Sequence, residues 1–404
     1  MKILLVSVNH APEQTGIGKY QGEMAAWLVR RGHSVRVITT PPHYPEWKIH
    51  AGYTGRAYRT EILDGAKVVR VPVYVPASPT GLRRVLHLLS FGVTSAPVIL
   101  KETLLWRPDV VFVTEPPLTA VPMALLGAFL CGARTQLHVL DFEVDAAFQL
   151  GILKPKILLC LVSAVERFLM RGFRIVSTLT PRMRERLLAK GVPEARALLL
   201  PIWANVEDFD HAPDGQEWRL QQGIDPNTII ALYSGNLGQK QGLETIVGAA
   251  RLLESETKIR FIVAGDGSGR AQLMDMARGL SNISFLPVQP RDSFVPMMRA
   301  ADLHLLPQRA QAADLVMPSK LGNILASGRP VVAGASSGTQ LFDAVQGCGF
   351  AVPPDDAKAF AAAIRQLADD KALRETTGAE GIRRAHAEWS RETLLTRMEA
   401  GFSS

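Results

Sequence analysis

Apolar and polar residues follow two alternating patterns along the 404-residue chain. Short apolar runs such as Lys2–Val8 and Ser34–Thr39 are typical of strands buried on both faces of a parallel sheet. Between them lie longer segments with apolar residues every three or four positions, which is the spacing of a helix that packs by one face. This alternation continues to Trp389 without a short-period repeat. It predicts an α/β fold built from doubly wound parallel sheets.

The alternation begins twice, each time with a strand, a glycine-rich loop and a helix. The first start lies at residues 2–29 and the second at 228–250, after a proline-containing polar segment at 201–215. We therefore expect two Rossmann-like domains that face each other across a cleft, residues 1–200 and residues 201–385.

The composition is that of an ordinary globular protein, with 47% hydrophobic and 21% charged residues. Three scattered cysteines without a Cys-x-x-Cys pair argue against a disulfide framework or a zinc site, and fit a reducing compartment. The first residues form a strand pattern rather than a signal peptide. No apolar run reaches the ~18–20 residues of a membrane-spanning helix. The longest candidate, 118–131, is interrupted by Pro122. A cytoplasmic location is expected.

The charge is unevenly distributed between the two halves. Residues 1–200 hold 25 Lys and Arg against 14 Asp and Glu, a net charge of +11, whereas residues 201–404 hold 20 against 24, or −4. A basic half favours an anionic partner. No nucleic-acid-binding motif accompanies it, so nucleic acid is not expected. The basic residues around the apolar helix expected at Lys156–Arg171 suit peripheral contact with an anionic membrane, although a solvated helix face has the same pattern.

The first glycine-rich loop, Asn9–Gly18, does not have dinucleotide-binding spacing. A third glycine in register would fall on Gln21, and no acidic residue follows the next strand, so NAD binding is not expected. Gly16 and Gly18 instead allow the backbone to approach a substrate closely. The segment Pro41–Tyr58 is rich in Pro and aromatic residues and is expected to be irregular, with the next strand at 67–71.

Ionisable groups cluster after the strand expected at 134–140. His138, Asp141, Glu143 and Asp145 lie at or beyond its carboxyl end, where α/β proteins build their sites. We single out His138 and Asp141 as groups that could orient or deprotonate an acceptor hydroxyl, with capping of the next segment as the alternative.

The second glycine-rich loop follows the strand at 228–233 and contains Gly235, Asn236 and Lys240. A lysine at such a turn can neutralise a phosphate that leaves during the reaction. A third loop, Gly265-Asp266-Gly267, follows the strand at 258–264.

A polar segment at 314–319 leads into a short apolar helix that Gly328 ends. The free N–H groups at the start of such a helix can hold a phosphate. Pro318, Ser319 and Lys320 stand at this start, and Asn323 lies one turn further, where it could reach a sugar hydroxyl. An ordinary buried helix is the alternative interpretation.

These motifs resemble those of the retaining, family 4 type glycosyltransferases with the GT-B fold. The resemblance covers nearly the whole chain and is strongest from Leu232 to Pro354. Gly328-Arg-Pro-Val-Val matches the end of the family's donor signature, and Met-Pro-Ser-Lys-Leu-x-Asn looks like the branch that builds colanic-acid-type exopolysaccharide. Two departures concern the donor site. Asn323 and Leu315 replace two glutamates, and Asn236 replaces an arginine, with Lys240 one residue before the family's lysine.

The resemblance implies a hexosyltransferase-type enzyme. It would move a sugar from a GDP- or UDP-sugar to a saccharide acceptor, with retention of configuration, and a polyprenyl-linked acceptor would fit the basic first half. The final helix, 386–404, would cross back to the first domain. The donor would contact Gly16, Gly18, Gly235, Asn236, Lys240, Gly265, Asp266, Gly267, Val288, Pro318, Ser319, Lys320 and Asn323, with Asp141, His138 and Lys240 in catalytic roles.

No cofactor or metal is expected: the Asp-x-Asp of the sequence, at residues 208–210, lies in the segment between the two expected domains and not among these residues. Two alternatives remain open from the residues. One is a nucleotide-sugar epimerase of the same fold, and the other is a non-catalytic nucleotide-sugar-binding protein.

Overall fold

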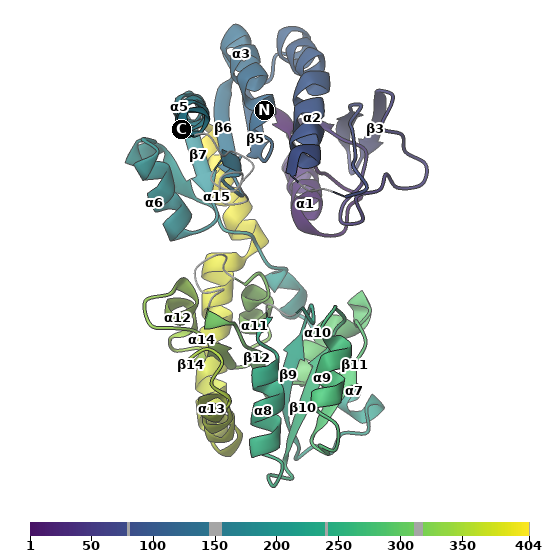
Figure 1. The fold of residues 1–404 in the computed structure, drawn as a ribbon, viewed down its shortest axis with the longest axis vertical. Coiled ribbons are helices and arrows are strands. Elements are labelled where there is room, and N and C mark those ends of the chain that lie inside the picture. Colours follow the sequence, from purple (N-terminus) through teal and green to yellow (C-terminus); the bar gives the residue numbers. More distant parts are fainter. Residues whose placement is uncertain (79–80, 145–155, 239–240, 311–317, 404) are drawn as a thin grey trace. The chain divides into compact units, whose positions relative to one another are not determined.

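The computed structural model describes residues 1–78, 81–144, 156–238, 241–310 and 318–403 (Figure 1). It divides into two compact units. Unit 1 comprises Met1–Pro201 with Leu395–Ser404, and unit 2 comprises Ile202–Leu394. Each unit is built around its own sheet and is described separately.

Unit 1 contains an eight-stranded sheet in the order β3-β4-β2-β1-β5-β6-β7-β8. All neighbouring strands are parallel except β3, which pairs antiparallel with β4. The strand order reverses between β1 and β5, and this switch point is where open α/β sheets bind ligands. The strands are β1 (Lys2–Val6), β2 (Ser34–Thr39), β3 (Arg59–Leu63), β4 (Ala66–Arg70), β5 (Val110–Glu115), β6 (Arg134–Val139), β7 (Ile175–Thr178) and β8 (Ala197–Leu199).

Helices cover both faces of this sheet. One core cluster joins Val111 and Val113 of β5 to helices on one face, including Phe91 and Leu169. Phe112 points to the opposite face, because successive strand residues alternate, and there its ring meets that of Phe402 at 6.2 Å. The helices are α1 (Gly16–Arg30), α2 (Gly81–Lys101), the π-helical η1 (Glu102–Trp106), η2 (Leu118–Ala120), α3 (Val121–Cys131), α5 (Lys156–Arg171), α6 (Pro181–Ala189), η3 (Glu194–Arg196) and α15 (Arg391–Ser403).

Unit 2 contains a six-stranded, fully parallel sheet in the order β11-β10-β9-β12-β13-β14. Apolar side chains from its two faces form two separate buried clusters. Its strand order reverses between β9 and β12. The strands are β9 (Ile229–Ser234), β10 (Ile259–Ala264), β11 (Ile283–Leu286), β12 (Leu303–Leu306), β13 (Val331–Gly334) and β14 (Gly349–Val352). The helices are η4 (Val206–Phe209), α7 (Gln216–Gln221), α8 (Glu244–Leu252), α9 (Arg270–Met276), α10 (Arg291–Ala300), α11 (Leu321–Ala326), α12 (Gln340–Val345), α13 (Ala357–Asp369) and α14 (Lys371–Trp389).

One strand and the expectation about membrane-spanning length differ from the sequence-based predictions. Strand β3 follows the irregular segment directly and was not expected. The apolar pattern at 82–105 predicts one long helix, and α2 indeed continues through η1, so that Gly81–Trp106 forms 26 helical residues, within which an 18-residue window has a mean hydropathy of 1.3. By length and composition alone this stretch could cross a membrane, which corrects the expectation that no apolar stretch is long enough; a core helix of a soluble protein passes the same test.

Candidate functional site

Two glycines bring the loops after β9 and β10 into direct contact in unit 2. Gly265 has φ +144°, and a Cβ atom on it would lie 1.9 Å from the carbonyl oxygen of Gly235. Gly235 has φ +146° and donates its N–H to the Ala264 carbonyl at 2.9 Å. The absence of side chains therefore leaves a backbone-lined edge at the carboxyl ends of adjacent strands. Gly267, Asn236 and the exposed Asp266 continue this edge.

Lys320 extends across Gly235. A Cβ atom on Gly235 would lie 2.4 Å from Lys320 Nζ, so only glycine leaves room for the ammonium group. This group donates to the hydroxyl of Tyr233 at 2.5 Å and lies 4.3 Å from the centre of the tyrosine ring. The Tyr233 hydroxyl in turn donates to the Asn236 carbonyl at 2.8 Å. Lys320 is thereby held in one position beside the glycine edge.

Burial determines the charge state of this lysine. It lowers the pKa of Lys320 from its usual range to about 8 and raises the pKa of Tyr233. At neutral pH the lysine is therefore mostly charged and the tyrosine is neutral. The sequence does not single out Tyr233 as a site residue, because it lies within an apolar strand, where an aromatic side chain is expected to be part of the core.

The other expected donor residues lie in several environments. Asn323 is in α11, and its Oδ1 is buried without a hydrogen-bond partner in the described structure. Ser319 and Val288 are exposed, and Pro318 is half-buried. Lys240 lies outside the described residues. Because α11 has only six residues, its N-terminus is a weak anion site, and Lys320 is the stronger one.

The loop after β1 in unit 1 encloses a buried carboxyl group, that of Glu13. Its Oε1 accepts from the backbone N–H groups of His43 and Tyr44 at 2.9 and 3.0 Å. Its Oε2 is buried without a partner in the part of the chain that the structure describes, and lies 2.3 Å from where Gly18 would carry a Cβ atom. A Cβ atom on Gly16 would similarly lie 3.0 Å from the ring of Tyr44, which follows β2. The two predicted glycines therefore make room for Glu13 of this loop and for Tyr44 of the next one.

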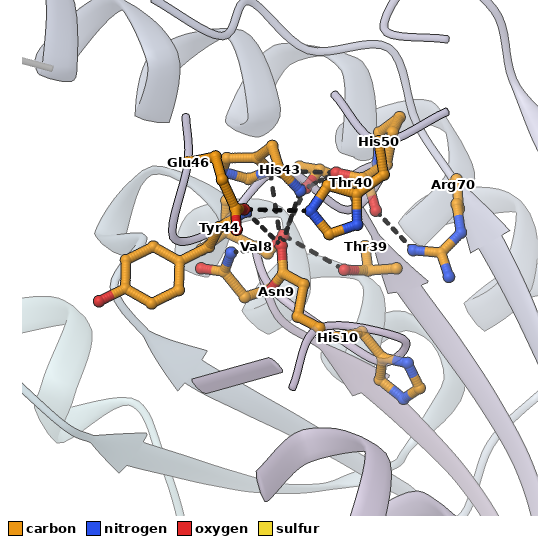
Figure 2. Close-up of polar contacts among 12 residues, drawn as sticks. Val8, Asn9, His10, Thr39, Thr40, His43, Tyr44, Glu46, His50 and Arg70 are labelled. Atoms are coloured by element: carbon orange, nitrogen blue, oxygen red, sulfur yellow. Dashed lines mark hydrogen bonds and ion pairs between the residues drawn. The ribbon is translucent and has the colours of Figure 1, made fainter. Parts of the chain in front are cut away.

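The surroundings of Glu13 are largely uncharged. Burial raises the pKa of Glu13, and burial lowers the pKa of His10 to about 4 and also lowers that of His43. Arg70 carries a permanent positive charge here: it pairs with Glu61 at 2.5 Å and donates to the carbonyl of Thr40 at 2.8 Å (Figure 2) and to that of Ala11 at 2.7 Å. No motif singles out Glu13 in the sequence, because one acidic residue in a loop is ordinary.

The predicted acceptor residues lie at the end of β6. Asp141 is exposed, two residues beyond the strand. His138 is buried within it and shares a hydrogen bond with the Ser177 hydroxyl at 3.0 Å. Burial lowers the pKa of His138 to about 4, so its ring is neutral at neutral pH. The roles assigned to both residues stay predictions.

Two further carboxyl groups lie at this edge. Glu115 ends β5 and is fully buried, and neither of its carboxyl oxygens has a hydrogen-bond partner among the described residues. Burial, with Glu143 nearby, raises the pKa of Glu115 well above its usual range. Glu143 accepts from the N–H of Leu118 at 2.5 Å, and burial raises the pKa of Glu143 to about 7. Burial therefore favours the protonated forms of both carboxyl groups at this edge.

Comparisons with known proteins cover both units. Residues 15–203 match the family described as glycosyl transferase 4-like domain, and residues 228–370 match glycosyl transferases group 1. The chain is 41% identical over 377 residues to the putative colanic acid biosynthesis glycosyl transferase WcaI of Escherichia coli K12, covering 91% of this chain and 92% of that protein. It is 23% identical to the glycogen synthase of Mycobacterium tuberculosis, covering 98% and 93%.

Solved structures show the same fold. Sucrose-phosphate synthase from Thermosynechococcus elongatus has a TM-score of 0.68 at 18% identity and covers 100% of this chain and 98% of its own. Anabaena HepE in complex with UDP and glucose has a TM-score of 0.66 at 16% identity, with 100% of both chains covered.

Proposed function

Because this chain belongs to the glycosyltransferases, together with the colanic acid biosynthesis relative, we propose that it moves a sugar from a GDP- or UDP-sugar to a hydroxyl group of a saccharide acceptor. The enzyme class and the two GT-B-type α/β domains are those expected from the sequence. The named relatives do not favour the epimerase and binding-protein alternatives.

The position of Lys320 over Gly235 carries this proposal. A diphosphate laid along the glycine edge would meet a charged ammonium group that Tyr233 already holds in place. Such a preorganised cation stabilises the charge that develops on a departing phosphate. Lys320 would thus supply the charge that the arginine replaced by Asn236 provides elsewhere in the family, with Asn323 reaching a hydroxyl of the donor.

The transfer itself retains the configuration of the sugar. The bond between the anomeric carbon and the diphosphate oxygen breaks as the acceptor oxygen forms its bond on the same face. The acceptor proton passes to the departing phosphate oxygen. Asp141, exposed beyond β6, would orient the acceptor hydroxyl, whereas the buried His138 would act through Ser177. No metal takes part in this scheme.

The acceptor is proposed to be lipid-linked. The colanic acid relative is named for the synthesis of a polysaccharide, and the basic N-terminal half suits peripheral contact with an anionic membrane at the inner face of the cytoplasmic membrane.

Thermal unfolding of the full chain with UDP, GDP, ADP, dTDP, CMP and NAD, in EDTA, tests the donor site. One nucleoside diphosphate should stabilise the protein by about 2.7 kcal/mol at a hundredfold excess over its Kd. Lys320→Met should weaken this binding by about tenfold at pH 7. Because the pKa of Lys320 is about 8, the native affinity should fall between pH 7 and pH 9.5, and the variant should lack this dependence.

The matched control is Lys358→Met, which removes an exposed lysine of α13 in the same unit. Unchanged nucleotide affinity in Lys320→Met would remove Lys320 from the site. Conversion of the donor without an acceptor would instead indicate an epimerase, and binding without turnover would indicate a binding protein.

A further inference from the structure

Three helices of unit 1 expose an unusual amount of apolar surface. Twelve of the 22 large apolar residues that the described chain exposes lie on α2, η1, α3 and α5, whereas all of unit 2 exposes five. On α2 they form a stripe at helical spacing, Leu82, Leu86, Leu89 and Val93. A patch of this kind on one layer of helices marks an interaction surface.

The three helices form one continuous layer. α2 and α3 pack side by side (Figure 1), and a Cβ atom on Gly172, just after α5, would lie 3.0 Å from the Leu125 side chain of α3. The C-terminal ends of the layer carry its most exposed side chains. Phe129 is 83% exposed, and Leu105 and Phe168 are each 76% exposed. We call this outer surface the α2–α3–α5 face.

The charges on this face have one sign. α2 and α3 contain no Asp or Glu. The one acid of η1, Glu102, is buried and paired with Arg36, and the one acid of α5, Glu166, is buried and paired with Lys190 at 2.5 Å. Exposed basic residues stand beside the apolar ones, among them Arg83, Arg84 and Arg167. Apolar side chains accompanied only by cations are typical of surfaces that lie on an anionic bilayer.

A hollow of 350 Å³ adjoins the C-terminal ends of α3 and α5. Arg134, Arg174 and Arg196 line it, and none of the described Asp or Glu residues does. Arg134 also donates to the Phe402 carbonyl at 2.9 Å. Thr135, which also lines it, accepts from the Arg174 N–H at 3.0 Å and keeps its own hydroxyl proton to donate. This hollow is at the amino-terminal end of β6, at the opposite edge of the sheet from Asp141. Three guanidinium groups around one hollow are suited to binding a phosphate group.

We propose that the α2–α3–α5 face docks on an anionic phospholipid bilayer, with Leu105, Phe129 and Phe168 entering the apolar boundary and a lipid phosphate bound in the arginine-lined hollow. This deepens the membrane contact proposed above and rests on it. A second copy of the chain or a protein partner would leave the one-signed charge of the face unexplained.

Flotation of the full chain with phosphatidylcholine vesicles, with and without phosphatidylglycerol, tests the docking. The protein should bind only the anionic vesicles. Replacing Leu105, Phe129 and Phe168 by Ser together should weaken binding by more than tenfold, and Arg174→Gln with Arg196→Gln by about tenfold or more. The control pair in unit 2, Leu220→Ser with Arg278→Gln, removes an equally exposed leucine and arginine and should leave binding unchanged.

Several outcomes would overturn the proposal. Equal binding to both kinds of vesicle would do so, as would unchanged binding in either variant. If the native chain binds no vesicles, a dimer that the apolar variant dissociates would indicate a second copy as the partner. Stabilisation of the native chain by inorganic phosphate, lost in the arginine variant and again without vesicle binding, would indicate a site for free phosphate. The nucleotide-induced thermal shift should persist in every variant. If the native protein showed no nucleotide-induced thermal shift, this would count against the donor site, and vesicle binding could still be measured. Failure of the proposed function and failure of the membrane docking are therefore distinguishable.

Discussion

Single buried side chains set the electrostatics of this protein. Glu13, Glu115 and Glu143 are held in surroundings that disfavour their charged forms, because desolvation outweighs the hydrogen bonds that Glu13 and Glu143 accept, and Glu115 accepts none among the described residues. Sequence reasoning identified the ionisable cluster after β6 but not the raised pKa of Glu115, since burial is a property of the folded sheet. The pairing of Lys320 with Tyr233 was hidden for the same reason, because the two residues lie 87 positions apart.

The raised pKa of Glu143, about 7 against 4.5, makes stability depend on pH. Below pH 4.5 the carboxyl is protonated in both folded and unfolded chains. Between pH 4.5 and 7 the unfolded chain releases its proton first, so stability falls by up to about 1.4 kcal/mol per pH unit for a fully buried group. Glu143→Gln should therefore stabilise unit 1 by about 1 kcal/mol at pH 8 and hardly at all at pH 4.5, as measured by urea unfolding.

The groups that face Glu143 set the size of this effect. Asp141 and Glu166 raise the pKa of Glu143, whereas the Leu118 N–H and Arg84 lower it. The glutamine amide oxygen can still accept from the Leu118 N–H, so the substitution removes the titratable carboxyl group and keeps this hydrogen bond. Equal stabilisation at both pH values would mean that Glu143 has an ordinary pKa.

At the scale of elements, the buried strands and their helices followed from the apolar pattern. Strand β2 and helix α5 coincide with their predicted ranges, because each is an apolar run or stripe bounded by polar turns. Strand β3 was missed because Arg59-Thr-Glu61 reads as a polar loop. A signal was nevertheless present: Asp64 and Gly65 have φ of +48° and +80°, the conformation of a two-residue hairpin turn, for which Asp-Gly is a preferred sequence.

This turn gives a test of how the hairpin is attached to unit 1. A Cβ atom on Gly65 would lie 2.7 Å from Val29 of α1, whereas Gly52, with a similar φ of +85°, has open space. Gly52→Ala should cost about 1 kcal/mol from backbone strain alone. Gly65→Ala should cost about 2 kcal/mol in equilibrium unfolding, because Val29 must also move. Equal costs would show that the hairpin turn is free to shift away from α1.

The path of the whole chain makes unit 1 discontinuous. Residues 202–394 form unit 2, and the chain then returns so that residues 395–404 belong to unit 1. The final helix brings Leu395, Met398 and Phe402 into fully buried positions, and Arg134 donates to the Phe402 carbonyl at 2.9 Å. The apolar pattern alone could predict a helix here. The surface on which this helix packs is known only from the folded sheet, where the Phe402 ring contacts that of Phe112.

Unit 1 should therefore depend on a residue near the end of the chain. Phe402→Ala removes a ring that is 1% exposed and should cost unit 1 about 3–5 kcal/mol. Hydrogen exchange followed by mass spectrometry should show lower protection in peptides from residues 1–201 and unchanged protection in peptides from β9 to β14. Phe360→Ala, which truncates a fully buried ring of α13, should give the reverse pattern. Equal loss of protection in both units from either variant would mean that the two sheets unfold as one cooperative body, despite their separate cores.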